Sequence, residues 1–173
     1  MTRQTCGVSP TARPGSLPTV TRKKLVAATP ERVYDLVSDP VRLVDWWPRV
    51  VRVEDVVGRA GSDRSRWTCV LSADSGRMLR LDYSSTGATR PNRFEWEHEL
   101  EGTPFESSLT RQSFEVRIDA KEEGSEVKLT TVNVLRGGAR VAGFSMKKGQ
   151  KQLIDGALES LARLFEEKEA SDG

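Results

Sequence analysis

The stretch ATPERVYDLVSDP at residues 28–40 decides how the rest of the chain is interpreted. Thr29 followed by Pro30 is a typical helix start, because a threonine side chain can cap the first turn and proline suits the first helical position. Apolar residues come next at helical spacing, and residues 38–40 repeat the start signal. We therefore expect two short helices in succession, the second ending near Pro48. Its predicted inward residues are Leu43, Val44 and Trp47.

On both sides of these helices the hydrophobic period changes to two, which is typical of strands. A first strand is predicted at residues 19–28, and about six more between residues 50 and 135, joined by tight turns. The clearest alternation lies at residues 94–101. There, apolar residues and His98 occupy one face, and four glutamates occupy the other (Glu95, Glu97, Glu99 and Glu101). Consecutive strands of this kind favour an antiparallel meander.

Two stretches interrupt this regularity. Residues 84–92 contain Gly87 and Pro91 and are predicted to form a loop. In the last strand, residues 126–135, Val127 and Val132 imply opposite faces. We expect either a bulge near residues 130–131 or a strand covered on both faces at its end.

A long helix is predicted from about residue 144 to residue 168, with apolar residues in two adjacent rows that form a wide stripe. The first row is Leu153, Ala157, Leu161 and Phe165; the second is Ile154, Leu158 and Ala162. The economical solution is an α+β fold, a curved antiparallel sheet wrapped around this C-terminal helix. The glycine-bearing residues 136–143 would form a flexible lid before it. Lys147, Lys148 and Lys151 would form a small basic patch in the first turns of this helix or a solvated surface.

Composition bounds the domain count and the class of partner. A chain of 173 residues predicts one domain, here residues 19–168, with a disordered tail at 1–18 and a frayed end at 169–173. The net charge is +2, and the tail alone carries +2, so the rest is neutral and nucleic acid is not an expected partner. No apolar run is long enough to span a membrane.

The small numbers of cysteine and histidine residues limit the disulfide and metal chemistry that the chain can support. Cys6 and Cys69 form no disulfide framework, so a reducing cytoplasm is the expected compartment. One histidine and two cysteines cannot form a convincing zinc site, and we expect neither a metal nor another cofactor. The glycine spacing at residues 138–143 lacks the Lys-Ser/Thr pair of a phosphate loop, so nucleotide binding is rejected.

The order of elements is that of the helix-grip fold, and the sequence resembles the SRPBCC superfamily over residues 19–168. This superfamily groups START-type lipid-transfer domains, the birch-pollen allergen family and polyketide aromatase/cyclases. The matching stretches are residues 28–40, residues 46–50 (WWPRV), residues 93–96 (RFEW) and the apolar stripe of residues 153–165. The subgroup that it most resembles is the bacterial polyketide cyclase/dehydrase-like one. The resemblance implies a deep, largely apolar cavity between sheet and long helix. The residues do not reproduce the catalytic set of an aromatase/cyclase.

His98 is the candidate catalytic residue, because it lies on the inward face between Trp96 and Leu100. An imidazole there could hydrogen-bond a carbonyl or act as a general base. The alternative is a buried neutral histidine that only satisfies a structural hydrogen bond. Trp46 and Trp47 are neighbours and are not expected to both point inward, so one should lie at the cavity rim.

Aromatic and polar residues of inward parity are the candidate ligand contacts, since planar apolar ligands favour aromatic walls. They are Trp46, Trp47, Trp67, Leu81, Tyr83, Phe94, Trp96, Gln112, Phe114, Asn133, Ile154 and Leu158. Thr131 shares this parity. The glutamates on the opposite face should pair across strands with Arg111 and Arg117, and Arg80 is expected on that same solvent face as a further partner of these glutamates.

The function expected from these features is binding, and possible conversion, of a small hydrophobic or polyaromatic ligand by a monomer or homodimer. One alternative is a polyketide cyclase/dehydratase-type enzyme in which His98 transfers protons. The other is a protein-interaction domain, which would need an exposed apolar patch.

Overall fold

The computed structural model describes residues 18–137 and 140–171. Seven strands form one antiparallel sheet in the order β1-β7-β6-β5-β4-β3-β2. The strands are β1 (Thr19–Val26), β2 (Val50–Val57), β3 (Arg66–Ser72), β4 (Met78–Thr89), β5 (Arg93–Glu99), β6 (Leu109–Lys121) and β7 (Gly124–Leu135). The helices are α1 (Pro30–Val37), the 3-10 turn η1 (Pro40–Arg42), α2 (Leu43–Trp46) and α3 (Arg140–Ser171).

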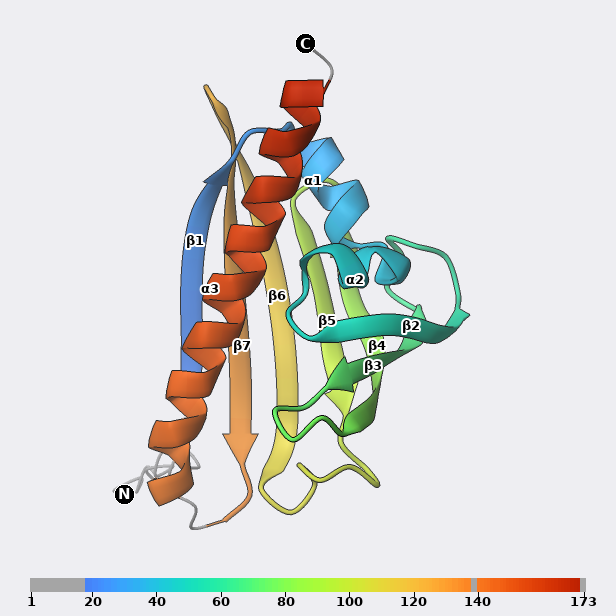
Figure 1. The fold of residues 1–173 in the computed structure, drawn as a ribbon, viewed down its shortest axis with the longest axis vertical. Helices are drawn as coiled ribbons and strands as arrows, with labels where there is room; N and C mark the ends of the chain where they lie inside the picture. Colours follow the sequence, from blue (N-terminus) through green and yellow to red (C-terminus); the bar gives the residue numbers. More distant parts are fainter. Residues whose placement is uncertain (1–17, 138–139, 172–173) are drawn as a thin grey trace, which may run out of the picture.

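The sheet is strongly curved and holds α3 on its inner side. Figure 1 shows β2 and β3 running across the direction of β1, β7 and β6, with α3 lying over β1 and β7. The first strand pairs with the last, so the two ends of the domain close on each other in one sheet. This arrangement is the predicted helix-grip fold, and the predicted α+β class is confirmed.

The two predicted helix starts both form. The Thr29 side chain accepts a hydrogen bond from the Arg32 backbone N–H at 3.4 Å, and Pro30 occupies the first turn of α1. The Asp39 carboxylate accepts one from the Val41 N–H at 3.1 Å. The second helix is shorter than expected, because η1 and the single turn of α2 replace one helix running to Pro48.

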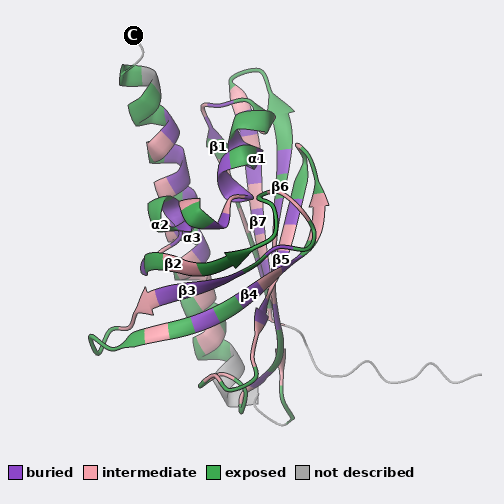
Figure 2. Cartoon of the chain, turned by 90° about the vertical axis from the view of Figure 1, so that its right-hand side faces the viewer, coloured by how far each residue is buried: buried purple, intermediate pink, exposed green. Residues whose placement is uncertain are grey.

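Burial alternates along the central strands, and the inner face forms the core with α1, α2 and α3 (Figure 2). The second half of α3 completes that core, since Ile154, Leu158 and Leu161 are at most 2% exposed. The first half does not, because no residue from 144 to 153 is buried and Phe144 is 81% exposed. One helix therefore has a packed half and a loosely covered half.

Two predictions about the strands were wrong. Residues 84–89, expected in a loop, continue β4, which absorbs one extra residue between Ser85 and Gly87. Of the two alternatives expected for residues 126–135, the bulge near residues 130–131 does not form, because β7 pairs with β6 without interruption from Val134 back to Gly124. The inward parity of β7 is unbroken, and only the apolar pattern changes, because β7 turns polar residues inward and places Val132 and Val134, both half-buried, on its outer face.

Other differences concern the segment before α3 and the chain ends. Residues 140–143, expected in a lid, belong to α3, and residues 138–139 of that lid lie outside the described residues. The predicted tail also lies outside them, apart from Pro18, whose carbonyl accepts from the Asn133 N–H at 3.3 Å. Within the described ranges, none of the helices combines the length and the apolar character that crossing a membrane requires.

The turn between β6 and β7 depends on a glycine. Gly124 has φ +131°, in a region that side chains rarely adopt, and a Cβ there would lie 2.1 Å from the Val26 carbonyl oxygen. This contact joins the β6–β7 turn to the end of β1. Gly76, in the turn before β4, also has positive φ (+78°), but nothing lies within 4 Å of its would-be Cβ.

The outer edge strand β2 is irregular. Its pairing with β3 shifts register between Val50 and Arg52 and again between Glu54 and Val57. Asp55, in the second shift, has φ +52°. The strand β2, which lies at the right of Figure 1, therefore presents an irregular edge.

Candidate functional site

Two neighbouring rows of residues cross the inner face of the sheet at the end where β5 and β7 stop. We call the first the polar row: Trp67, Tyr83, His98, Gln112 and Asn133, one residue from each of β3 to β7. The second, which we call the aromatic row, runs one pleat further in: Ser85, Trp96, Phe114 and Thr131. Strand pairing alone brings these residues together from positions up to 66 apart in the chain.

A hydrogen-bond chain links three members of the polar row. His98 Nδ1 lies 3.0 Å from the side-chain oxygen of Gln112, and the Gln112 amide donates to Asn133 Oδ1 at 2.8 Å. All three residues are at most 9% exposed. Gln112 therefore supplies the orienting partner for His98 that the sequence analysis did not identify.

Several atoms around this chain are buried without a hydrogen-bond partner. In the described part of the protein they are His98 Nε2, Asn133 Nδ2, Thr131 Oγ1, Trp67 Nε1, Trp46 Nε1 and Gln150 Oε1. Four of the six belong to the two rows. Leaving a buried polar atom unpaired costs about 1–3 kcal/mol, so such a concentration is unusual in a purely structural core.

The imidazole of His98 is held in its neutral form. Burial lowers the pKa of His98 below its usual value, and the bond to Gln112 and the carboxylates of Asp82 and Glu99 oppose this only in part. A neutral imidazole has one N–H and one lone pair, which suits hydrogen bonding or general-base chemistry.

This lowered pKa predicts a pH dependence of stability. The unfolded chain takes up a proton on its single histidine near pH 6.5, whereas the folded protein does so only at lower pH. The free energy of unfolding should therefore be fully retained above pH 6.5 and should fall as the pH drops below it. Urea titrations of the wild type and His98→Gln at several pH values between 7.5 and 5 measure this. Parallel profiles for the two proteins would contradict the assignment.

Aromatic rings wall both rows. Tyr83 stacks on His98 at 5.0 Å and on Trp67 at 6.1 Å between ring centroids. Trp96 stacks on Phe114 at 5.4 Å in the aromatic row. Flat rings thus line the inner face around the polar groups, an arrangement suited to planar apolar molecules.

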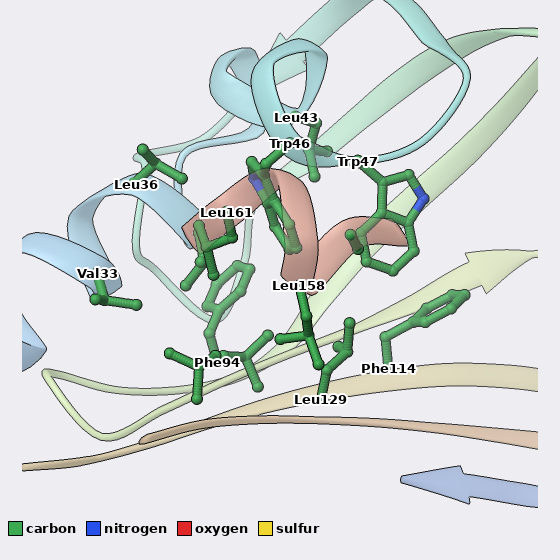
Figure 3. Packing of buried hydrophobic residues seen from close by; sticks show 14 of the residues in the cluster. Val33, Leu36, Leu43, Trp46, Trp47, Phe94, Phe114, Leu129, Leu158 and Leu161 are labelled. Carbon is green, nitrogen blue, oxygen red and sulfur yellow. The ribbon is translucent and has the colours of Figure 1, made fainter. Parts of the chain in front are cut away.

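The prediction that either Trp46 or Trp47 lies at the cavity rim is wrong, since the two residues are only 2% and 6% exposed. Helix α2 ends between them, and Trp47 has extended backbone angles, so the two side chains are not constrained to diverge as helical neighbours are. Figure 3 shows both rings directed from α2 toward the face that carries Phe94 and Phe114. Val44, also expected inward, is 42% exposed.

Of the other predicted ligand contacts, some lie beside the two rows and some belong to the hydrophobic core. Leu81 lies on the inner face beside the rows, opposite Cys69. Phe94 packs edge-on against Tyr34 of α1, and Ile154 and Leu158 belong to the packed half of α3. Sequence reasoning missed Phe105, whose ring meets His98 edge-on at 5.8 Å from the loop after β5. Phe105 lies in an irregular segment, where no parity rule applies.

The outer face is charged, as predicted. Arg111 pairs with Glu97, and Arg66 pairs with Glu99. Two pairings differ from the prediction: Arg117 bonds Glu115 rather than one of the four glutamates, and Arg80 bonds Glu54 and Asp55 of β2. None of these carboxylates reaches the inner face, so they do not form a paired-carboxylate site.

A small groove of about 220 Å³ lies elsewhere, between α1 and the end of α3. Its lining residues are Arg32, Asp35, Leu36, Arg42, Phe165 and Lys168, none of which was a predicted contact. Across the described ranges no group of three or more His, Cys, Asp or Glu side chains could hold a metal ion.

The chain matches the model of one known protein family. The model of the family described as "Polyketide cyclase / dehydrase and lipid transport" matches residues 18–166. No curated protein sequence matches this chain at a significant level.

Solved structures share the architecture at low identity. A START superfamily protein from Mycobacterium smegmatis matches with a TM-score of 0.68 and 13% identity, covering 86% of this chain and 97% of its own. Ara h 8.0201 matches with a TM-score of 0.67 and 17% identity, over 87% of this chain and 98% of its own. The di-domain ARO/CYC StfQ from the steffimycin biosynthetic pathway matches with 0.69 and 12%, over 90% of this chain. This chain spans about half of that di-domain (52%).

Proposed function

Because this chain belongs to the polyketide cyclase/dehydrase and lipid transport family, we propose that it binds a small, largely apolar ligand against the polar and aromatic rows. The observation that carries this proposal is the set of buried, unpartnered polar atoms among stacked aromatic rings. A ligand with an apolar body and a few polar atoms would satisfy both features at once.

The uneven packing of α3 supports the same location. Asn133, the last member of the polar row, lies two residues before the end of β7 and seven residues before the start of α3. There α3 presents its loosely covered half, in which Gln150 also has a buried, unpartnered oxygen. A ligand could contact the sheet on this side without displacing the packed half of the helix.

Native mass spectrometry of gently purified protein, followed by extraction of any bound molecule, tests the proposal first. A co-purifying apolar or polyaromatic molecule would support ligand binding and identify its class. The proposal fails if the protein is empty and a panel of such molecules also leaves its tryptophan fluorescence unchanged.

Replacement of Phe105 separates ligand contact from core packing. Phe105 is only partly buried and faces His98, so Phe105→Ala should weaken binding of a naphthyl fluorophore about tenfold while costing less stability than the loss of a fully buried ring such as Trp96. Titration of probe fluorescence measures the affinity. Val57→Ala, which shortens an exposed apolar side chain at the end of β2 and away from both rows, is the control and should bind as the wild type does.

A cyclase- or dehydratase-type activity is the second candidate. It is favoured by one observation, a neutral His98 that is oriented by Gln112 and has a free Nε2. In such a reaction Nε2 would accept a proton from the bound chain. His98→Gln should then abolish turnover with the fold intact, whereas turnover that survives this change would assign His98 a purely structural role.

A further inference from the structure

The hydrogen-bond chain His98–Gln112–Asn133 has a direction. Gln112 accepts at one end of its amide, from His98, and donates at the other, to Asn133. Because an amide oxygen cannot donate, His98 Nδ1 must carry the proton in this arrangement. The neutral imidazole has no second proton, so His98 Nε2 presents a lone pair.

The two ends of the chain are therefore of opposite type. At the His98 end the unpartnered atom is an acceptor, and at the Asn133 end the unpartnered Nδ2 is a donor. His98 and Asn133 stand on β5 and β7, with β6 between them, so roughly 10 Å separates their backbones. The hydroxyl of Thr131, two residues before Asn133 on the same face, is also unpartnered and can play either role.

The surroundings contain no compensating charge. Among the buried residues that the structure describes, none is Lys, Arg, Asp or Glu. An ionised ligand would lose its hydration here without an ion partner, which is a large cost. Flat aromatic rings flank both ends, through Tyr83 against His98 and Phe114 beside Thr131.

We propose that this chain of three side chains selects a neutral ligand that carries a hydroxyl group at one end of a flat apolar skeleton and a carbonyl group at the other. The hydroxyl donates to His98 Nε2 and the carbonyl accepts from Asn133 Nδ2. This assignment rests on the proposed binding function and adds the chemical class of the ligand. Skeletons with two acceptors and no donor, and carboxylate anions, are disfavoured.

Three matched probes test the selection by calorimetry. The first is 6-hydroxy-2-acetylnaphthalene, which has one donor and one acceptor across two fused rings. Its methyl ether keeps the skeleton but loses the donor, and 6-hydroxy-2-naphthoate replaces the ketone with an anion. The hydroxyketone should bind about tenfold or more tightly than either analogue, because only it pairs both free ends. Equal affinities for the hydroxyketone and its ether would overturn the selection while leaving ligand binding intact.

Gln112→Met tests whether the chain itself carries the selection. The substitution keeps a long unbranched side chain but removes the central amide, so the preference for the hydroxyketone over its ether should fall to about twofold or less. Ser113→Ala, on the outer face of the same strand, should keep the wild-type preference. A preference that Gln112→Met leaves unchanged would contradict the role of Gln112.

A measurement without ligand checks the direction of the chain. His98 is the only histidine, so its two ring nitrogens can be assigned directly by ¹⁵N NMR. The Nδ1-protonated neutral form is expected in the wild type, with loss of this preference in Gln112→Met. An Nε2-protonated ring in the wild type would overturn the assignment. Binding of neither ketone would also overturn the ligand class, and a different molecule found by native mass spectrometry would then leave the proposed function standing.

Discussion

Replacing Trp96 with alanine is expected to lower the free energy of unfolding by about 3–5 kcal/mol. Trp96 is 3% exposed and stands at the centre of the aromatic network, against Phe114 at 5.4 Å, Trp47 at 5.5 Å and Phe94 at 5.7 Å between ring centroids. The truncation would remove contacts to three aromatic rings at once and leave a large void. Ligand affinity should fall as well, because Trp96 belongs to the aromatic row.

Urea unfolding followed by circular dichroism measures the effect without relying on the tryptophan that is removed. Phe144→Ala is the control, since this ring is 81% exposed and its loss should change stability by no more than about 0.5 kcal/mol. A Trp96→Ala protein that melts at the wild-type temperature would show that the Trp96 ring is not packed into the inner face of the sheet.

The second large effect is expected at Gly124, where alanine should cost about 3 kcal/mol of stability. Part of this cost is the backbone conformation, φ +131°, which is strained for any residue with a Cβ. The rest comes from the would-be Cβ, 2.1 Å from the Val26 oxygen, which forces β1 and the β6–β7 turn apart. Because β1 pairs with β7 along its length, the separation would disturb the pairing of the first and last strands.

Gly76→Ala distinguishes these two causes. Gly76 has φ +78° but open space around it, so its substitution should cost only about 1 kcal/mol, from the backbone alone. The difference between the two variants contains the clash with β1 together with the greater backbone strain at φ +131°. Equal losses of stability would mean that the backbone of β1 moves away freely, contrary to its close packing against the β6–β7 turn.

Much of this fold could be predicted because its helix starts and strand alternation follow local sequence rules. Thr29-Pro30 and Asp39-Pro40 both start helices here, and strict alternation in β5 assigned Trp96 and His98 to the inner face correctly. These rules failed where the alternation of apolar residues along a strand does not mark its buried face. In β7 the inward residues Thr131 and Asn133 are polar and Val132 lies outside, so hydrophobicity alone suggested a bulge that does not exist.

The site was predictable residue by residue but not as an arrangement. Parity marked His98, Gln112 and Asn133 as inward, but it did not reveal that they form one row. Their meeting depends on the register of β5 with β6 and of β6 with β7, which turn lengths and bulges determine. The burial of both Trp46 and Trp47, and the contribution of Phe105, escaped for a related reason, because Trp47 and Phe105 lie where regular structure has ended.

The irregular edge strand β2 bears on how this protein behaves at high concentration. An open sheet invites strands of neighbouring molecules to add to its edge, which is a common route to aggregation. In β2 the two register shifts and the positive φ of Asp55 break the even spacing of backbone donors and acceptors, and Arg52 and Glu54 add charge. A second copy could not extend the sheet at β2 without straightening the strand, so the irregularity protects this one of the two sheet edges against edge-to-edge growth.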